Sequence, residues 1–199
     1  MTNQPRTLLE MAGAKLVPPT FEAAVVVVVD AQNEYLDGAL ALPGIGPASA
    51  AIARLLAAAR AAGAPVIHVV HHGRPGGLFD PEGRGAAIID ACAPAEGEAV
   101  CVKGLPNSFT SPAFVEAVKA TGRQQLILTG FMAHMCVSST ARAALDHGLF
   151  TCIPADAVAD RDLPDPLGGV QPAAALVRAE LAALADRFSL VVPSVEVFL

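Results

Sequence analysis

The hydrophobic pattern of this chain alternates between short β-branched runs and longer Ala-rich segments. Ala23–Val29 is the most apolar run, and its five consecutive valines show no alternation with polar residues. Such a run is typical of a strand that is buried on both faces of a parallel sheet. Similar runs recur along the chain, so we expect six strands, at 23–29, 65–70, 98–103, 125–129, 149–154 and 188–192.

Segments with helical spacing lie between these runs. In 47–62, for example, Ile52, Leu55 and Leu56 share one helical stripe, and Gly63 is a suitable C-terminal stop. Further helices are expected at 112–120, 136–145 and 172–186. Alternating strands and helices of this length predict a Rossmann-like α/β fold, a doubly wound, mostly parallel six-stranded sheet with helices on both faces.

Composition agrees with one domain that has a sizeable core. The chain has 199 residues, of which 53% are hydrophobic and 16% charged, and this predicts a single domain over 1–199 with residues 1–20 as an N-terminal extension. The low charged fraction also predicts that a partner subunit covers some apolar surface. This is in keeping with a homo-oligomer.

Charge and cysteine usage narrow the partners and the location. The net charge is −6 without a Lys/Arg cluster, so neither nucleic acid nor an anionic membrane is an expected partner. The longest apolar run is far shorter than the roughly 20 residues that span a bilayer. The four cysteines form no CxxC pair and the N-terminus lacks a signal-peptide core, so we expect free thiols in a cytoplasmic protein.

Three chemically active side chains follow three of the expected strands. Asp30 follows the valine run, Lys103 ends the 98–103 run, and Cys136 lies where the 125–129 run passes into a helix. Each has an ordinary explanation alone: an Asp caps turns, a Lys is solvated, and a Cys is buried. Because the carboxyl ends of parallel strands meet at one sheet edge, together they predict a site with a base, a cation and a nucleophile.

The predicted place of Cys136 suits a nucleophile. A thiol at a helix N-terminus faces unpaired N–H groups and the positive end of the helix dipole, which is expected to lower its pKa. Asp30 can then act as general base and later as general acid, since none of the five histidines is placed as clearly. The thiolate would attack an amide carbonyl and form a thioester that water hydrolyses, with Lys103 holding positive charge nearby.

Three segments carry a resemblance to a known family. They are Asp30–Asn33 (DAQN), Val102–Phe109 (VKGLPNSF) and Gly130–Ala141 (GFMAHMCVSSTA). In this order and spacing they resemble the signature segments of the isochorismatase-like cysteine hydrolases, over about residues 22–192. The resemblance implies a catalytic triad of Asp30, Lys103 and Cys136, a cis peptide bond at Phe131–Met132, and an oxyanion hole formed by the N–H groups of Met132 and Cys136.

The resemblance also suggests a reaction. Members of the family hydrolyse C–N bonds in nicotinamide, carbamoyl compounds, ureides and lactam-type antibiotics, whereas the branch that gives the family its name cleaves a vinyl ether and generally lacks the cysteine. Cys136 therefore favours a small-molecule amide substrate. The resemblance, together with the low charge, also implies a homo-oligomer, either a dimer or a tetramer. Two alternatives stay open: a non-catalytic relative that binds a metabolite or a protein, and an ether or ester hydrolase that does not use the thiol.

Metal binding is not expected, and neither is an organic cofactor. The nicotinamidase branch of the family binds a divalent metal through an Asp-x-His pair and a further His, but the equivalent region here, 70–75, has no matching Asp. His68, His71 and His72 are the available ligands. Adjacent side chains on a strand point to opposite faces, so His71 and His72 rarely share one ion.

Further residues are candidates for the walls of the substrate pocket. They are Gln32, Tyr35, Asn107, Phe131 and His134. Gln32 is expected either to orient Asp30 or to satisfy a turn, and Phe131 suits core packing as well as ligand contact. The long Gly/Pro-rich connection 71–94 and the connection 160–169 are also expected to shape the pocket.

Overall fold

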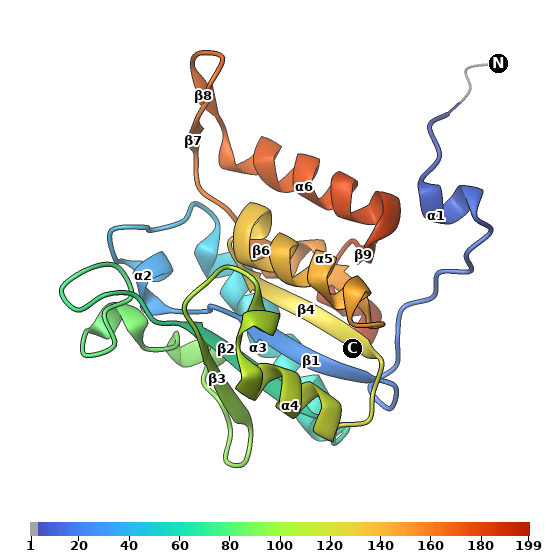
Figure 1. Cartoon of the computed structure of the whole chain (residues 1–199), viewed down its shortest axis with the longest axis horizontal. Coiled ribbons are helices and arrows are strands. Elements are labelled where there is room, and N and C mark those ends of the chain that lie inside the picture. The colour runs from blue at the N-terminus through green and yellow to red at the C-terminus, as the bar shows by residue number, and fades with distance from the viewer. Residues whose placement is uncertain (1–3) are drawn as a thin grey trace.

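A central parallel sheet organises the molecule (Figure 1). The computed structural model describes residues 4–199, so the first three residues of the expected N-terminal extension lie outside the described part. The strand order is β3-β2-β1-β4-β5-β9, and every pairing along it is parallel. The strands are β1 (Ala24–Val29), β2 (Val66–His71), β3 (Ala99–Lys103), β4 (Gln125–Phe131), β5 (Phe150–Pro154) and β9 (Ser189–Val192).

All six expected runs form these strands, and a seventh strand joins them. The short β6 (Val158–Ala159) pairs with the end of β4, with Gly130 opposite Val158 and Phe131 opposite Ala159. Two residues are too few to produce a periodic pattern, which is why the sequence did not reveal this strand. Beyond it, β7 (Leu163–Pro164) and β8 (Val170–Gln171) form a separate antiparallel hairpin, which projects from the body in Figure 1.

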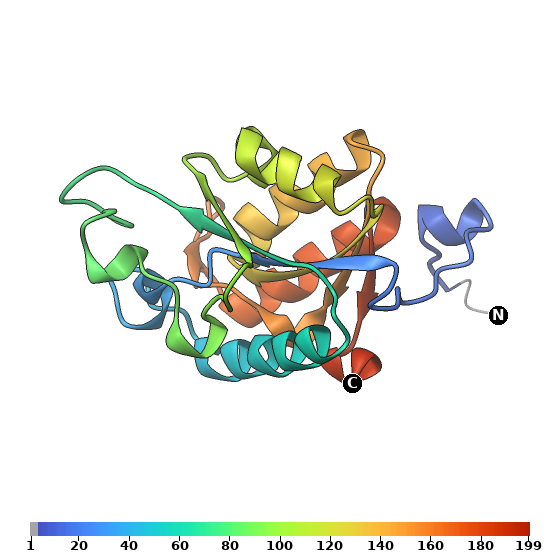
Figure 2. The same ribbon diagram turned by 90° about the horizontal axis from the view of Figure 1, so that it is seen from below.

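The valines of β1 are buried on both faces of the sheet, as their continuous run predicts. Val26 and Val28 belong to the core beneath α3 (Ile45–Ala61), whereas Val25, Val27 and Val29 belong to the core on the other face. The second face is covered by three helices, α4 (Pro112–Ala120), α5 (Ser138–Asp146) and α6 (Ala173–Arg187). Figure 2 shows α3 on one side of the sheet and α4 and α5 on the other.

Two short helices lie outside these layers. In the N-terminal segment, α1 (Leu8–Met11) begins with a capping box between Thr7 and Glu10 and docks on α6, where the Leu8 N–H donates to Asp186 Oδ1 at 2.8 Å. The other short helix, α2 (Asn33–Leu36), follows β1. Within residues 4–199, no helix combines the length and the apolar character that crossing a bilayer requires.

The carboxyl edge of the sheet brings the expected site residues to one place. Asp30 directly follows β1, Lys103 is the last residue of β3, and β4 runs into a π-helical turn, Ala133–Val137, that contains Cys136. The connection 72–98, which includes two 3-10 turns, lies at the same edge and is tied to the start of α2 by a bridge between Gln32 and Ile88. The topology therefore gathers these elements around a single edge.

Candidate active site

Lys103 and Asp30 form a buried ion pair. Lys103 Nζ lies 2.7 Å from Asp30 Oδ2, and both side chains have 0% exposure. Asp30 has a left-handed backbone (φ 49°) at the point where the chain leaves β1, and its N–H donates to Val69 O on β2. Asp is one of the few residues that adopt this conformation readily, so the turn can aim the carboxylate across the sheet edge.

The same ammonium group also contacts the thiol. Lys103 Nζ lies 3.4 Å from Cys136 Sγ and 3.5 Å from His71 Nδ1. Since His71 is the register partner of Lys103 on β2, the lysine side chain reaches over the end of β2 to arrive at β1 and at the thiol. The structure thus brings Asp30, Lys103 and Cys136 together, as the spacing of the strand ends predicted.

The electrostatics of the site differ from the sequence expectation. Burial raises the pKa of Asp30, and the nearby Lys103 opposes this rise. Burial, followed by the charge of the Asp30 carboxylate, raises the pKa of Cys136 to about 12, although Lys103 opposes this rise. The expectation that a helix start lowers this pKa is therefore wrong, because desolvation and a neighbouring anion dominate. The thiol is protonated at neutral pH and needs a base to become a nucleophile.

Asp30 is suitably placed to be that base. Its Oδ2 accepts from Lys103, but its Oδ1 is buried and has no hydrogen-bond partner in the described structure. A buried carboxylate oxygen without a donor is unusual, and the neighbouring thiol supplies a proton that this oxygen can accept. By contrast, burial and the Lys103 charge lower the pKa of His71 to about 4, so His71 is neutral at pH 7.

Cys136 lies in a tight turn before α5 rather than at the first position of an α-helix. Met132 O accepts from the N–H groups of Met135 and Val137, both at 3.2 Å, and α5 begins only at Ser138. The peptide bond between Phe131 and Met132 is cis, which is the position that the family resemblance implies.

Asp160 connects the turn 133–137 to the sheet by hydrogen bonds. Its fully buried carboxylate accepts from the His134 N–H at 2.9 Å and lies 2.7 Å from His134 Nδ1. Asp160 follows β6, which pairs with the end of β4 just before the turn. His134 is thus a structural partner of Asp160, and its side chain does not line the cavity described below.

Gly130 allows β1 and β4 to approach closely beside the site. It has φ 114°, and a Cβ at this position would lie 1.9 Å from Val29 O. No other residue type fits between these two strands without moving one of them. The glycine therefore fixes where the turn with Cys136 leaves the sheet.

A cavity of about 210 Å³ opens onto the thiol. Of the expected site residues, Tyr35, Met132 and Cys136 lie in its wall. Its ten lining residues come from several connections at the carboxyl edge: Tyr35, Leu40, His71, Leu78, Phe79, Pro106, Met132, Met135, Cys136 and Arg161. The wall is mostly apolar, with Cys136, His71, Arg161 and the Tyr35 hydroxyl as its polar elements.

Three other residues that were expected to line the pocket make contacts elsewhere in the structure. Gln32 is fully buried and does not contact the Asp30 carboxylate; its amide instead accepts from the His71 N–H and donates to the carbonyls of His71 and Ala86. Asn107 accepts from the Phe109 N–H in the turn after β3. Phe131 is completely buried with its ring centroid 6.1 Å from that of Tyr35. None of the three lines the cavity.

Most residues of the cavity wall carry no signal in the sequence. Leu78 and Phe79 belong to the 72–98 connection and Arg161 to the one after β6, both of which were expected to shape the pocket, but no residue in them was identified. Loops between strands carry no periodic signal, and their path depends on contacts that a linear sequence does not display. The one feature of these loops that the sequence reveals is that they follow the carboxyl ends of strands, where ligands bind in such sheets.

The histidines considered as metal ligands are separated. His68 Nε2 lies in the core 3.0 Å from Glu98 Oε2, whereas His71 faces Lys103. Within residues 4–199, no three His, Cys, Asp or Glu side chains converge closely enough to hold a metal ion. Cys92, Cys101, Cys136 and Cys152 are all buried free thiols.

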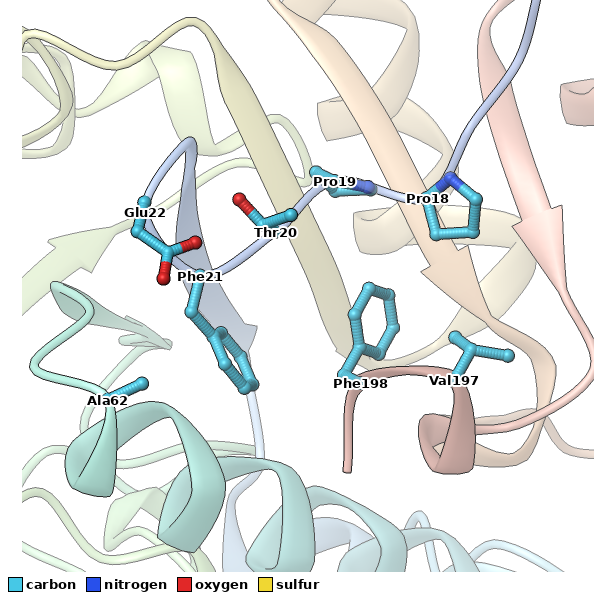
Figure 3. Close-up of a pocket in the computed structure, with 8 residues that line it drawn as sticks. All are labelled: Pro18, Pro19, Thr20, Phe21, Glu22, Ala62, Val197 and Phe198. Carbon is cyan, nitrogen blue, oxygen red and sulfur yellow. The ribbon is translucent and has the colours of Figure 1, made fainter.

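A second hollow, of about 270 Å³, lies at the amino end of β1, away from the triad (Figure 3). Its wall includes Phe21 and Phe198, whose ring centroids are 6.2 Å apart, and Glu22 is its one ionisable side chain. Nothing in it resembles a nucleophile with a base. The cavity at Cys136 is therefore the candidate active site.

The fold and the convergent triad define a class of α/β cysteine hydrolase, and sequence comparison gives the family. Residues 24–192 match the isochorismatase domain family. The chain belongs to the isochorismatase-like cysteine hydrolase family. In structure it is similar to an isochorismatase from Pseudomonas putida KT2440, with a TM-score of 0.94 and 41% identity, covering 98% of this chain and 100% of that one.

Relatives with descriptive names extend this comparison. The secreted isochorismatase effector Isc1 of Verticillium dahliae is 40% identical over 185 residues, 91% of this chain and 95% of the relative. A streptothricin hydrolase of Streptomyces noursei is 33% identical over 168 residues, 83% of this chain and 61% of that enzyme. The ureidoacrylate amidohydrolase RutB of Methylobacterium radiotolerans is 32% identical over 168 residues, 66% of this chain and 65% of the relative.

Proposed function

We propose that this protein is a cysteine-dependent amidohydrolase that cleaves a C–N bond of a small amide, carbamoyl compound or ureide. One observation carries the proposal: a single buried ammonium, Lys103 Nζ, contacts both the Asp30 carboxylate and the Cys136 thiol in the wall of a cavity. The relative named as a ureidoacrylate amidohydrolase supports this type of bond.

The first half of the reaction forms an acyl-enzyme. Asp30 Oδ1 accepts the Cys136 proton, and the thiolate attacks the carbonyl carbon of the substrate. Asp30 then returns the proton to the leaving nitrogen as the C–N bond breaks, which leaves a thioester on Cys136 and releases ammonia or an amine. Throughout, Lys103 keeps one positive charge beside the developing thiolate, so the buried site never holds two uncompensated anions.

The second half regenerates the thiol. A water molecule enters after the amine leaves, and Asp30 removes its proton as it attacks the thioester. The C–S bond breaks, the acid product departs, and the proton passes to the sulfur. The negative oxygen of each tetrahedral intermediate needs preorganised donors, and the N–H groups of Met132 and Cys136 are our candidates for this oxyanion hole.

Replacing the nucleophile tests this proposal. Wild-type protein is screened against amides, carbamoyl compounds and ureides for released ammonia or amine. Cys136→Ala and Cys136→Ser should then abolish turnover, whereas Cys152→Ala, which removes another buried thiol on β5, should retain it. Full activity of Cys136→Ala would overturn the thiol mechanism and favour the ether or ester alternative.

A non-catalytic relative would behave differently. It would bind a metabolite or a protein without forming an acyl adduct on Cys136, and mass spectrometry after exposure to the screened compounds detects such an adduct. Absence of both turnover and an adduct across the panel would favour this alternative. The buried ion pair beside the thiol argues against it, because burying two charges is costly without a task for them.

The oligomeric state, the partners and the location of the protein are also proposals. We propose a homo-oligomer that acts on a small molecule, with neither nucleic acid nor membrane as a partner. Exposed apolar side chains near the cavity and on the hairpin, among them Leu78, Leu105 and Leu167, support an interface. A cytoplasmic location stays a prediction, since one relative is described as secreted. Light scattering and cell fractionation test these points.

A further inference from the structure

The cavity at Cys136 contains one positive charge that the triad does not use. Lys103 is neutralised by Asp30, and both the thiol and His71 are uncharged at neutral pH. Arg161 lines the same cavity, and within residues 4–199 its guanidinium forms no ion pair with a carboxylate. The side chains of the cavity wall therefore carry a net positive charge.

The unfilled hydrogen-bonding capacity of Arg161 also indicates an anion site. Its Nε is buried and has no partner in the described structure, and its Nη1 makes only a long bond, 3.4 Å, to Asp162 O. The neighbouring Asp160 carboxylate accepts from the Arg161 backbone N–H but is otherwise directed at His134. An N–H donor that is buried without an acceptor, as the Nε of Arg161 is, is costly, and a bound anion would remove that cost.

We propose that Arg161 binds a carboxylate of the substrate, so that the amidohydrolase acts on small amides or ureides that carry one carboxylate. The planar guanidinium donates two parallel hydrogen bonds that match a carboxylate. The cavity, about 210 Å³, is smaller than the roughly 300–1,000 Å³ typical of drug-sized ligands. Its apolar wall, with Leu40, Leu78 and Phe79, would hold the short body between the two polar ends.

This assignment deepens the proposed function and rests on it for turnover, but the anion site itself is testable without a substrate. Iodoacetate and iodoacetamide alkylate a thiolate by the same displacement of iodide, and only iodoacetate carries a carboxylate. Mass spectrometry measures the rate of alkylation of Cys136 by each reagent, and the iodoacetate rate is divided by the iodoacetamide rate. The same ratio for glutathione at the same pH is the reference. A higher ratio at Cys136 than for glutathione shows that the cavity attracts a carboxylate.

Variants at Arg161 and at a control arginine test whether this preference depends on Arg161. Wild type and Arg161→Lys should prefer iodoacetate over the glutathione reference, and Arg161→Met should lose this preference by roughly 10- to 100-fold. Arg178→Met removes an exposed arginine on α6 and should behave as wild type. Equal ratios in wild type and Arg161→Met would overturn the proposal, whatever the protein hydrolyses.

Turnover provides a second arm. Ammonia release is compared for N-carbamoyl-β-alanine and its neutral counterpart N-butylurea, which share the ureide group. Arg161→Met should lose roughly 10- to 100-fold in kcat/KM on the carboxylate, mainly through KM, and change little on N-butylurea. Equal losses on both, or faster wild-type hydrolysis of N-butylurea, would reject the carboxylate subsite and leave the proposed amidohydrolase intact. Failure of Cys136→Ala to abolish turnover would instead reject the amidohydrolase.

Discussion

Lys103 Nζ donates to Asp30 Oδ2 at 2.7 Å although Lys103 ends β3 and Asp30 follows β1, two strands that are not neighbours in the sheet. The lysine spans the end of β2 to reach the carboxylate and the thiol beyond it. Because neither side chain is exposed, this pair is both a structural element and part of the proposed chemistry. The two roles can be separated by experiment.

Lys103→Met should destabilise the fold as well as abolish turnover. Removing one partner leaves the Asp30 carboxylate buried without a cation, which typically costs about 3–5 kcal/mol. The double variant Asp30→Asn/Lys103→Met should recover much of that stability and none of the activity. Urea unfolding followed by circular dichroism measures the first effect. A single variant as stable as wild type would show that the pair is not energetically coupled.

Asp30→Asn should make Cys136 more reactive to alkylation while it abolishes turnover. The Asp30 carboxylate raises the pKa of the thiol and Lys103 lowers it, so removing the carboxylate leaves the ammonium free to favour thiolate. The rate of iodoacetamide modification at pH 8, followed at Cys136 by mass spectrometry, should therefore increase. A slower rate would indicate that Asp30 activates the resting thiol instead of suppressing it.

Gly130→Ala should be far more damaging than Gly148→Ala. Both glycines have positive φ, but only at Gly130 would the added Cβ meet the backbone, 1.9 Å from Val29 O. The control, with no atom within 4 Å of its added Cβ, should lose about 1–2 kcal/mol from the left-handed backbone alone. Overlap with β1 should add about 1–3 kcal/mol or more at Gly130, measurable as a lower unfolding midpoint. Equal losses would contradict the close approach.

Acid stability should depend on Glu98. Hydrogen bonds from Arg60 are the main cause that lowers the pKa of Glu98 to about 2, against an ordinary value of 4.5. A carboxyl with a lowered folded-state pKa stabilises the fold fully above its unfolded pKa, and this contribution is lost as the pH falls from about 4.5 to 2.

The matched variant isolates this contribution. Glu98→Gln removes the titrating group, so its free energy of unfolding should fall less steeply between pH 4.5 and pH 2 than that of wild type. Chemical unfolding at a series of pH values measures the two slopes. Parallel curves would show that Glu98 does not titrate with the lowered pKa.

The sequence predicted the sheet and the triad because both depend on short-range signals. Continuous apolar runs such as Val25–Val29 identify strands buried on both faces, and parallel topology places the residues that follow them at one edge. Asp30, Lys103 and Cys136 could therefore be placed together without knowing their side-chain conformations. The short β6 lacked such a signal.

The environment of the site could not be predicted in this way. The pKa of Cys136 depends on its burial and on the distance to Asp30, which a helix-start argument leaves out. Gln32 lies two residues after Asp30, yet its amide holds the 72–98 connection to the end of β2. Arg161 lines the cavity only because of the path its loop takes, which the sequence pattern does not reveal.

The turn that carries Cys136 is attached to the sheet, whereas most of the cavity wall comes from connecting loops. Gly130 and Asp160 fix the turn that carries Cys136 from the sheet side, while Leu78 and Arg161 belong to connections outside the strands of the central sheet. Exchanging those connections between relatives can therefore change which compound enters the cavity without displacing Cys136. One scaffold can thus diversify in what it degrades while its bond-breaking step stays the same.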